Sequence, residues 1–198
     1  MSRLNETLAM DRRRFLRASL AGGALLVTGG ALLGPRLHAA ANTPIGKPGK
    51  VVLEIFGDDG RDLGPRDVPK LVLTDAQWRK RLSPASYEIM RREGTERAYS
   101  GDHEKPAVPG LYRCMACATA LYGAATQFDS GTGWPSFWQP IAKRNVVELS
   151  DHMFGMTRTA IRCAGCDSHL GHVFDDGPRP TGLRYCMNSV ALRFVPHA

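Results

Sequence analysis

After Ala41 the sequence has little excess of charge of either sign. The whole chain carries a formal charge of +7, but residues 1–41 hold six of the 26 basic and two of the 19 acidic residues. The other 20 basic and 17 acidic residues leave a net charge of +3 on the rest of the chain. A nucleic-acid-binding protein shows a basic patch as its electrostatic footprint. So small a charge predicts that nucleic acid is not a partner.

The chain also lacks features that mark several other classes of protein. It has no low-complexity tract, no internal repeat apart from two Cys-x-x-Cys motifs, and no alternation of strand and helix patterns typical of a βαβ unit. With 43% hydrophobic and 23% charged residues the composition is that of an ordinary globular protein, which excludes wholesale disorder and fibrous repeats. A length of 198 residues allows one domain with an appendage.

The one long apolar stretch, residues 18–35, has the surroundings of an export signal. The basic cluster Arg12-Arg13-Arg14-Phe15-Leu16-Arg17 precedes it, and the small residues Ala39-Ala40-Ala41 follow it. This order of charged, apolar and small residues is that of a secretory signal. Paired arginines before Phe-Leu resemble the twin-arginine signal of bacteria. We therefore expect residues 1–41 to be a cleaved twin-arginine-type signal peptide and the mature protein to be periplasmic.

The alternative for this stretch is a transmembrane anchor. About 20 apolar residues are needed to span a bilayer, and residues 18–35 lie at the lower edge of that range. No cysteine lies near the stretch, so we expect no lipid anchor. Once the signal is cleaved, we expect no stable membrane insertion.

Residues 42–70 are interpreted as an extension or linker before the main domain. The segment is rich in Gly, Pro and Asp around one apolar run, residues 51–56. This pattern predicts a strand over 51–56, a turn over 57–60 and a linker after it.

Two short helices are predicted next. Thr74 and Gln77 have the spacing of a capping box, which predicts a helix from Asp75 to about residue 82. Ser83 is a good N-cap and is followed by proline, which predicts a second helix ending near residue 94. Beyond residue 110 the apolar runs are short and separated by Gly, Pro and Asp, which favours an antiparallel, mainly β domain.

Four of the five cysteines form two pairs, Cys114-x-x-Cys117 and Cys163-x-x-Cys166. Each pair offers two thiolates from one turn, and two such turns complete a tetrahedral zinc site. Four thiolates leave no coordination position open, so the expected zinc, one per chain, is structural. Two redox-active dithiols or two disulfides are the alternatives.

The fifth cysteine, Cys186, lies two residues after Arg184 and is a candidate nucleophile with a lowered pKa. His169 and His172 offer a general acid near neutral pH. Trp134 offers an apolar wall for a thioether or methyl group. Each residue also has a plain structural interpretation: a buried thiol, zinc-binding or structural histidines, and a core tryptophan.

Taken together, these segments closely resemble the B-type methionine sulfoxide reductases, the peptide-methionine (R)-S-oxide reductases. The motifs occur in the family's order, and the resemblance runs from about Leu71 to Phe194, within a domain expected over 71–196. It is carried by four segments: Cys114-x-x-Cys117, Gly-Trp-Pro-Ser-Phe at 133–137, His-Leu-Gly-His-Val-Phe-Asp-Asp-Gly-Pro at 169–178, and Arg-Tyr-Cys-Met-Asn-Ser at 184–189.

The resemblance implies a fold of two small antiparallel sheets, with the zinc site away from the active site. It also implies that Cys186 is the nucleophile, that it forms a sulfenic acid, and that the R epimer of methionine sulfoxide in oxidised proteins is the substrate. The implied catalytic residues are Cys186, His169, His172 and Asn188. The implied substrate-binding and supporting residues are Trp134, Phe137, Arg184 and Asp176.

Three positions depart from the family pattern. Thr132 stands where many members have the resolving cysteine, Ala160 replaces a usual acidic residue, and Met187 replaces a β-branched residue. Only Thr132 is expected to affect the mechanism. With no spare thiol, the sulfenic acid would be reduced by an external thiol donor such as a thioredoxin-like domain.

Two other functions are compatible with parts of the pattern. One is an exported, zinc-stabilised β-fold that binds a partner without catalysis, which would need no free thiol at Cys186. The other is an exported dithiol oxidoreductase that uses its Cys-x-x-Cys pairs and would contain no zinc.

Overall fold

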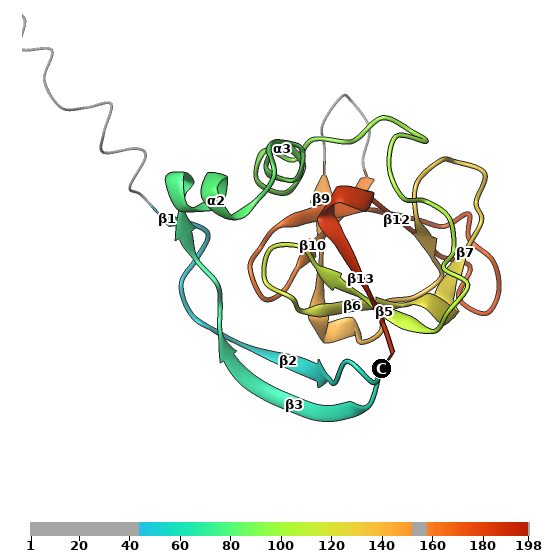
Figure 1. Cartoon of the computed structure of the whole chain (residues 1–198), viewed down its shortest axis with the longest axis horizontal. Helices are drawn as coiled ribbons and strands as arrows, with labels where there is room; N and C mark the ends of the chain where they lie inside the picture. Colours follow the sequence, from blue (N-terminus) through green and yellow to red (C-terminus); the bar gives the residue numbers. More distant parts are fainter. Residues whose placement is uncertain (1–43, 152–157, 198) are drawn as a thin grey trace, which may run out of the picture. The chain divides into compact units, whose positions relative to one another are not determined.

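Two antiparallel sheets form the centre of the computed structural model, which describes residues 44–151 and 158–197 (Figure 1). The larger sheet has the strand order β7-β8-β12-β11-β10-β9, and the smaller has the order β13-β5-β6. Two two-stranded ribbons, β1-β4 and β2-β3, precede them in the sequence. The expected mainly β fold with antiparallel sheets is confirmed. The expected signal peptide, residues 1–41, lies outside the described residues.

The strands of the larger sheet are β7 (Gln127–Phe128), β8 (Ser136–Phe137), β9 (Val146–Asp151), β10 (Arg158–Cys163), β11 (His169–Phe174) and β12 (Arg184–Met187). The smaller sheet contains β5 (Gly110–Cys114), β6 (Ala120–Gly123) and β13 (Leu192–Pro196). The ribbons are formed by β1 (Pro44–Ile45), β2 (Lys50–Phe56), β3 (Asp62–Pro69) and β4 (Leu73–Thr74).

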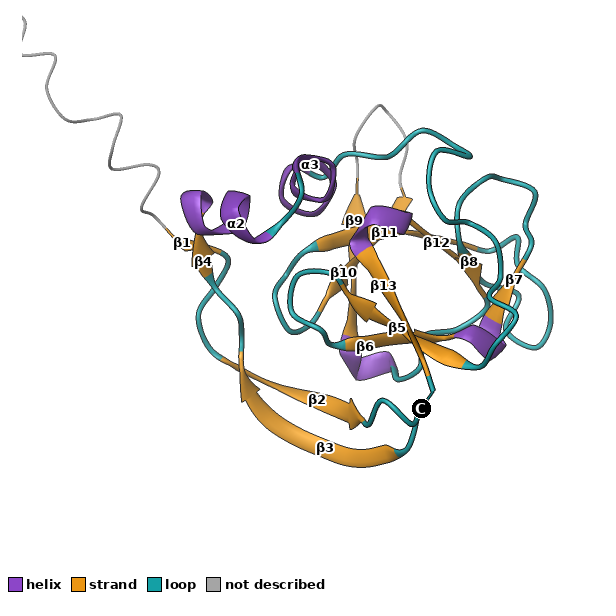
Figure 2. Cartoon of the chain, in the orientation of Figure 1, coloured by secondary structure: helices purple, strands orange, loops and turns teal. Residues whose placement is uncertain are grey.

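Both predicted helices are present and begin at the predicted caps. In α2 (Asp75–Arg81) the Thr74 side chain accepts a hydrogen bond from the Gln77 backbone N–H, and the Gln77 side-chain oxygen accepts one from the Thr74 backbone N–H. In α3 (Pro84–Arg92) the Ser83 side chain caps the first turn. The helix ends where Glu93 takes a left-handed conformation. Figure 2 shows both helices beside the sheets, and α3 packs against β11.

The core is filled by side chains that alternate along the strands. In β12 the burial alternates, so that Tyr185 and Met187 are buried while Arg184 and Cys186 are partly exposed. Because successive residues of a strand point to opposite faces, one face of β12 supplies the core and the other carries the polar residues. The fully buried ring of Phe137 stacks on that of Tyr122, with ring centroids 4.4 Å apart.

The segment after residue 60 differs from the expected linker. Residues 62–69 form β3, which pairs with β2 in an antiparallel hairpin. The sequence of β3 hides this pairing, because it has no alternating apolar pattern and contains two prolines. Proline is tolerated on a strand whose outer edge has no partner, and among the described strands β3 pairs only with β2.

Polar contacts hold the hairpin against the rest of the domain. Asn145 is fully buried in a short 3₁₀ turn, η2 (Lys143–Asn145). Its amide donates to the carbonyls of Glu54 and Ala120, and its oxygen accepts from the Glu54 backbone N–H, at 2.8–2.9 Å. The Arg113 guanidinium, from β5, also donates to the carbonyl of Phe56 in the hairpin at 2.8 Å.

We predict that Asn145→Ala lowers the free energy of unfolding by about 2–4 kcal/mol, because it leaves buried backbone groups of Glu54 and Ala120 without partners. Chemical denaturation measures the change. The control is Lys143→Ala, an exposed position of the same turn, where about 0.5 kcal/mol or less is expected. Equal losses in the two variants would contradict this role of Asn145.

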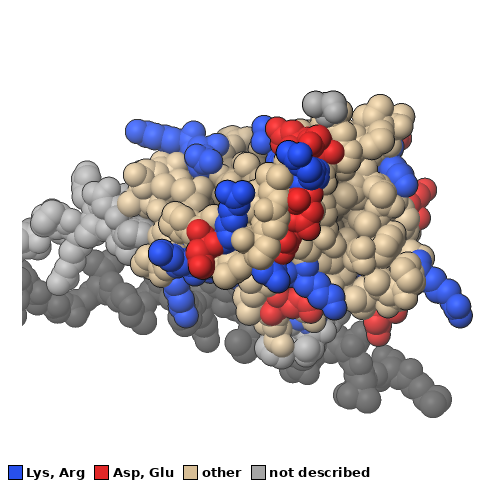
Figure 3. All heavy atoms as spheres, turned by 90° about the horizontal axis from the view of Figure 1, so that it is seen from below, with Lys and Arg blue, Asp and Glu red and all other residues tan. Residues whose placement is uncertain are grey.

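Surface charges of opposite sign lie beside one another on the face drawn in Figure 3. Two of the ion pairs join the hairpin to the domain, Arg113 with Asp58 and Arg144 with Glu54.

Within residues 44–151 and 158–197, no helix combines the length and apolar character needed to cross a bilayer.

Candidate functional site

The four paired cysteines converge in space from two similar turns. One turn joins β5 to β6 and the other joins β10 to β11. The residue after each second cysteine, Ala118 or Asp167, has a positive φ, and its N–H bonds the carbonyl of the first cysteine of its pair at 2.9 Å. Both turns therefore aim their two thiols in the same way.

The spacing of the sulfur atoms fits a tetrahedral metal ion. All four Sγ atoms lie within 4.8 Å of one another. Cys114 Sγ is 3.8 Å from Cys166 Sγ, and Cys117 Sγ is 3.4 Å from Cys163 Sγ. Metal–sulfur bonds of about 2.3 Å in a tetrahedron place the sulfur atoms about 3.8 Å apart. Each Cys-x-x-Cys pair is followed by a strand, so the helix expected after a thioredoxin-like motif is missing from both.

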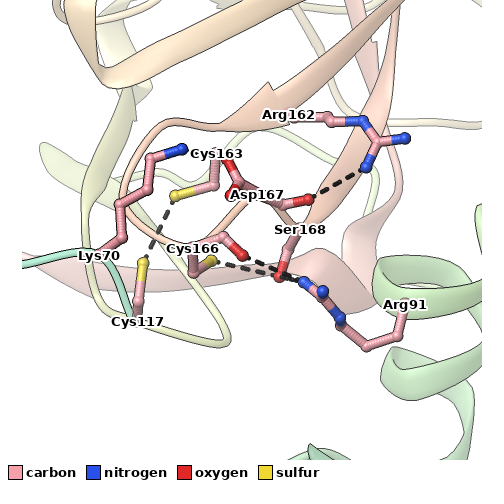
Figure 4. A network of polar contacts seen from close by, with 8 residues as sticks. All are labelled: Lys70, Arg91, Cys117, Arg162, Cys163, Cys166, Asp167 and Ser168. Carbon is pink, nitrogen blue, oxygen red and sulfur yellow. Dashed lines mark hydrogen bonds and ion pairs between the residues drawn. The ribbon is translucent and has the colours of Figure 1, made fainter. Parts of the chain in front are cut away.

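Three cations surround the second of these turns (Figure 4). Arg91 donates to the Cys166 carbonyl and to the Ser168 hydroxyl, each at 3.1 Å. Lys70 forms an ion pair with Asp167, and Arg162 donates to the Asp167 carbonyl. Four thiolates around a divalent ion leave a net negative charge. With a metal bound, these cations would offset that charge, and their hydrogen bonds fix the turn that presents the sulfurs.

One row of residues across the larger sheet contains the candidate nucleophile. Cys186 in β12 is paired with His172 in β11 on one side and with Ser136 in β8 on the other. Directly paired residues point to the same face of a sheet, so the three side chains adjoin. The hydroxyls of Thr132 and Ser136 and the Arg184 guanidinium also act on the Cys186 thiol, each lowering its pKa.

The close approach of β11 to β12 explains the glycine between the two histidines. A Cβ on Gly171 would lie 2.1 Å from the carbonyl oxygen of Cys186, nearer than any side-chain atom can come. Glycine at this position therefore lets His172 reach its place beside the cysteine.

The expectation of a lowered pKa for Cys186 is corrected by the structure. Burial raises the pKa of this thiol. The charge of Arg184 and the hydrogen bonds from Thr132 and Ser136 act in the opposite direction but only partly offset the effect of burial. At neutral pH Cys186 is therefore mainly a thiol.

A bulge brings the second histidine to the same face of the sheet. In β10, Ile161 pairs with Gly171 and the next residue, Arg162, pairs with His169, so Leu170 is an extra residue in β11. Without this bulge, two residues three apart would point to opposite faces. With it, the rings of His169 and His172 are 5.2 Å apart in an edge-to-face contact. His172 lies opposite Cys186. His169 is buried and lies next to His172.

The departure at Ala160 also lies in this row. Ala160 is buried and pairs directly with His172 across β10 and β11. The sequence suggested that only Thr132 concerns the mechanism. The register shows that residue 160 is a direct neighbour of His172, so the acidic side chain usual at this position would lie beside that histidine.

Arg184 and Asp176, both expected at the site, form an ion pair. Two parallel bonds of 2.8 Å join the guanidinium to the carboxylate, and they lower the pKa of Asp176. The same guanidinium lies 4.4 Å from the centre of the Phe174 ring. Both contacts fix Arg184 where its charge acts on Cys186.

Glu96 is a site residue that the sequence did not indicate. Its carbonyl accepts a bond from the indole N–H of Trp134 at 3.1 Å, which fixes the ring. Its carboxylate accepts bonds from Ser189 and Val190 at the start of η4 (Ser189–Ala191). Its backbone N–H donates to the Asn188 side chain at 2.9 Å. No motif marks Glu96, because its partners are about 40 and 90 residues away in the chain.

Two of the residues expected at the site, Asn188 and Phe137, are buried. The Asn188 side chain is buried between two backbone groups, accepting from Glu96 and donating to the Leu170 carbonyl at 3.0 Å. We therefore describe it as a positioning residue in place of the catalytic residue that was expected. Phe137 is fully buried against Tyr122, so its side chain belongs to the core and not to the site surface.

Comparison with known proteins identifies the family. Residues 82–196 match the family model of the SelR domain. "Peptide methionine sulfoxide reductase MsrB" of Thiobacillus denitrificans is 53% identical over 130 residues, which cover 66% of this chain and 96% of that protein. The chain belongs to the MsrB family.

Other MsrB relatives have similar identities. The chloroplastic peptide methionine sulfoxide reductase B1 of rice (Oryza sativa subsp. japonica) is 54% identical over 121 residues, 61% of this chain but only 56% of the rice protein. An MsrB of Pseudomonas aeruginosa is 52% identical over 119 residues, 60% of this chain and 90% of that protein. The MsrB family match contains the cysteine cluster and the row around Cys186, whereas the β2-β3 hairpin lies outside it.

The raised pKa of Cys186 predicts a pH-dependent reactivity. Because only the thiolate is alkylated, the rate with iodoacetamide is expected to rise about tenfold per pH unit between about pH 7 and pH 9. The Cys186→Ser variant measures the background from the other four cysteines. A plateau of the rate near neutral pH would show a thiolate at rest and contradict the prediction.

Proposed function

We propose that this peptide methionine sulfoxide reductase reduces the R epimer of methionine sulfoxide in oxidised proteins, with Cys186 as its nucleophile. The observation that carries the proposal is the register of β12, which pairs Cys186 with His172 in a chain of the MsrB family. A free thiol and an imidazole side by side on one face of the sheet are what the chemistry requires. A module that only binds a partner would need neither.

The reaction begins when the Cys186 sulfur, as its thiolate, attacks the sulfoxide sulfur. His172, as imidazolium, protonates the sulfoxide oxygen while the bond between oxygen and the methionine sulfur breaks. The methionine sulfur gains two electrons and leaves as a thioether. The hydroxyl group is transferred to the Cys186 sulfur as the bond between the two sulfur atoms breaks, so Cys186 loses two electrons and becomes a sulfenic acid. The raised pKa of Cys186 requires that its thiol proton leave when substrate binds.

Selectivity for one epimer follows from the arrangement of unlike groups around the cysteine. The sulfoxide sulfur is chiral, with an oxygen, a methyl group and the peptide side chain as substituents. Trp134, fixed by Glu96, offers a wall for the methyl group, and His172 offers the proton for the oxygen. Only one epimer directs both groups correctly while its sulfur faces Cys186. The assignment of the R epimer is supported by membership of the MsrB family.

An external thiol is proposed to complete the cycle. Of the four remaining cysteines, all belong to the metal-binding cluster, and Thr132 stands beside Cys186 where a second thiol could have acted. A first external thiol attacks the sulfenic acid, releases water and forms a mixed disulfide, and a second thiol reduces that disulfide. A thioredoxin-like dithiol supplies both thiols.

We propose zinc as the metal of the four cysteines. A closed, all-thiolate, tetrahedral set is typical of structural zinc sites. The metal would join the β5–β6 turn to the β10–β11 turn, away from Cys186, and would take no part in the reaction.

Export is proposed from residues 1–41 alone. We expect the mature protein in the periplasm, where the donor would be a thioredoxin-like domain supplied with electrons across the membrane. Cell fractionation of the host tests this, with Lys replacing both Arg12 and Arg13 as the comparison. Equal periplasmic amounts of both proteins would contradict twin-arginine export.

The proposed activity is tested by turnover on the separated R and S sulfoxides of a methionine-containing peptide. We expect reduction of the R sulfoxide alone and no turnover by Cys186→Ser. Equal rates on both epimers, or activity that survives loss of Cys186, would contradict the proposal.

A further inference from the structure

Three hydroxyl groups are arranged in a ring with the Cys186 sulfur, and two hydrogen bonds join these hydroxyls to one another. The Ser130 hydroxyl lies 2.8 Å from the Thr132 hydroxyl and 2.8 Å from the Ser136 hydroxyl. Ser136 pairs directly with Cys186 across β8 and β12, and the hydroxyls of Thr132 and Ser136 both act on the Cys186 thiol to lower its pKa. Ser130 thus joins the two hydroxyls that contact the nucleophile.

The surroundings hold this ring in place. Ser136 is fully buried in β8 and paired with Cys186. The turn that carries Ser130 and Thr132 is fixed from two sides. The Asp129 carboxylate accepts from the Gly131 N–H at 2.8 Å, and the Tyr99 hydroxyl donates to the Gly131 carbonyl at 2.6 Å. The hydroxyl oxygens therefore lie at set positions, and only their protons are free to turn.

Counting protons shows what the ring can do. Each hydroxyl has one proton to donate and can accept two bonds. While the sulfur is a thiol, Ser136 can direct its proton to the Trp134 carbonyl, 3.2 Å away. When the sulfur becomes a thiolate, Thr132 and Ser136 can both direct their protons to it. Ser130 then donates to one of these hydroxyls, which polarises that hydroxyl and strengthens the bond it gives to sulfur.

We propose that Ser130 is a positioning residue for the nucleophile, which orients the Thr132 and Ser136 hydroxyls so that both donate to the Cys186 sulfur in its anionic form. The proposal concerns thiolate formation and so stands apart from the identity of the substrate. Its consequence for turnover rests on the proposed function. It also gives Thr132 a role. Its hydroxyl stabilises the Cys186 thiolate, whereas a cysteine at this position could form a disulfide with Cys186.

Other groups face Cys186 and remain unchanged when Ser130 is replaced. Arg184 comes from the same strand, and its charge is shared with Asp176. His172 faces the cysteine from β11, with His169 behind it. A change confined to the Ser130 side chain therefore reports on the hydroxyl ring.

The test compares the alkylation of Cys186 by iodoacetamide, as a function of pH, in the wild-type protein and in Ser130→Ala. A hydrogen bond to the charged form favours that form, so its loss disfavours the thiolate. Below the pKa of the wild-type thiol, we expect Ser130→Ala to react about three- to tenfold more slowly, the range for one weakened bond to an anion. Above both pKa values, where each thiol is fully ionised, the two rates should converge.

Two variants serve as controls. Ser130→Thr keeps the hydroxyl and should restore most of the wild-type profile. Ser150→Ala removes an exposed serine from β9 and should change nothing. A slowing of Ser130→Ala by the same factor at every pH would indicate general damage to the site and overturn the proposal, as would an unchanged profile.

Turnover of the R sulfoxide, measured in parallel near neutral pH, separates this proposal from the proposed function. If both hold, Ser130→Ala lowers kcat/KM by the same three- to tenfold factor, about that of one charge-assisted bond. A shifted alkylation profile in a protein that turns over no sulfoxide would support the role of Ser130 and contradict the proposed function.

Discussion

Replacing His172 by asparagine is expected to lower turnover of the R sulfoxide by a factor of roughly 10²–10⁴, the usual contribution of a positioned general acid. His172 pairs directly with Cys186 across β11 and β12, so we propose that its imidazole, and not that of His169, protonates the sulfoxide oxygen. Asparagine is a similar size and can still form hydrogen bonds, but it carries no ionisable proton. Steady-state kinetics and a thermal unfolding curve of the same preparation separate lost chemistry from lost fold.

His169→Asn is the matched control for this result. His169 lies behind His172, and the rings are 5.2 Å apart, so its effect should be smaller and should act through the position of His172. If His169→Asn lost more activity than His172→Asn, the assignment of the proton donor would be reversed. Unchanged turnover in both variants would exclude a histidine acid altogether.

The second large effect is expected on the fold. Cys114→Ser removes one of the four thiols that lie within 4.8 Å of one another. A structural zinc contributes on the order of 10–16 kcal/mol of apparent binding free energy in small zinc-dependent domains, more than the total stability of most domains. We expect this variant to contain little metal and to lose its native circular dichroism spectrum.

Cys186→Ser is the control that isolates the metal. It also loses a cysteine, but it should keep about one zinc per chain and a native spectrum while losing turnover. A Cys114→Ser protein that is metal-free, folded and active would contradict a structural metal site. Exposure of the wild-type protein to a strong chelator should give the same unfolding without any mutation.

The sequence predicted best those features that depend on neighbours in the chain. Thr74 with Gln77, and Ser83 before a proline, specify the starts of α2 and α3 within four residues, and both caps are present in the structure. The two Cys-x-x-Cys turns are local in the same sense. Their convergence into one cluster could be predicted because a tetrahedral ion needs four thiolates and the chain offers two pairs.

Features that depend on long-range pairing could not be predicted. The bulge at Leu170, which brings His169 to the face of His172, depends on how β11 pairs with β10. The role of Glu96 depends on a loop that returns to Trp134 and Ser189. The strand β3 is mostly polar and exposed and is specified by its partner, β2.

The direction of the Cys186 pKa shift was wrong for a related reason. Sequence shows that Arg184 is two residues away, and a nearby cation lowers a thiol pKa. It does not show how deeply the thiol is buried, and here burial has the larger effect. The balance between desolvation and charge can be judged only when the three-dimensional surroundings are known.

The most direct test of the one-cysteine cycle is the intact mass of the reduced protein after reaction with one equivalent of a methionine R-sulfoxide peptide. No external thiol is added, so the product of a single turnover remains on the enzyme. We predict a gain of one oxygen atom, captured by a sulfenic-acid trap and absent from Cys186→Ser, with the metal retained. A loss of two hydrogen atoms together with released zinc would show that a cysteine of the metal cluster resolves the sulfenic acid, and would contradict the account.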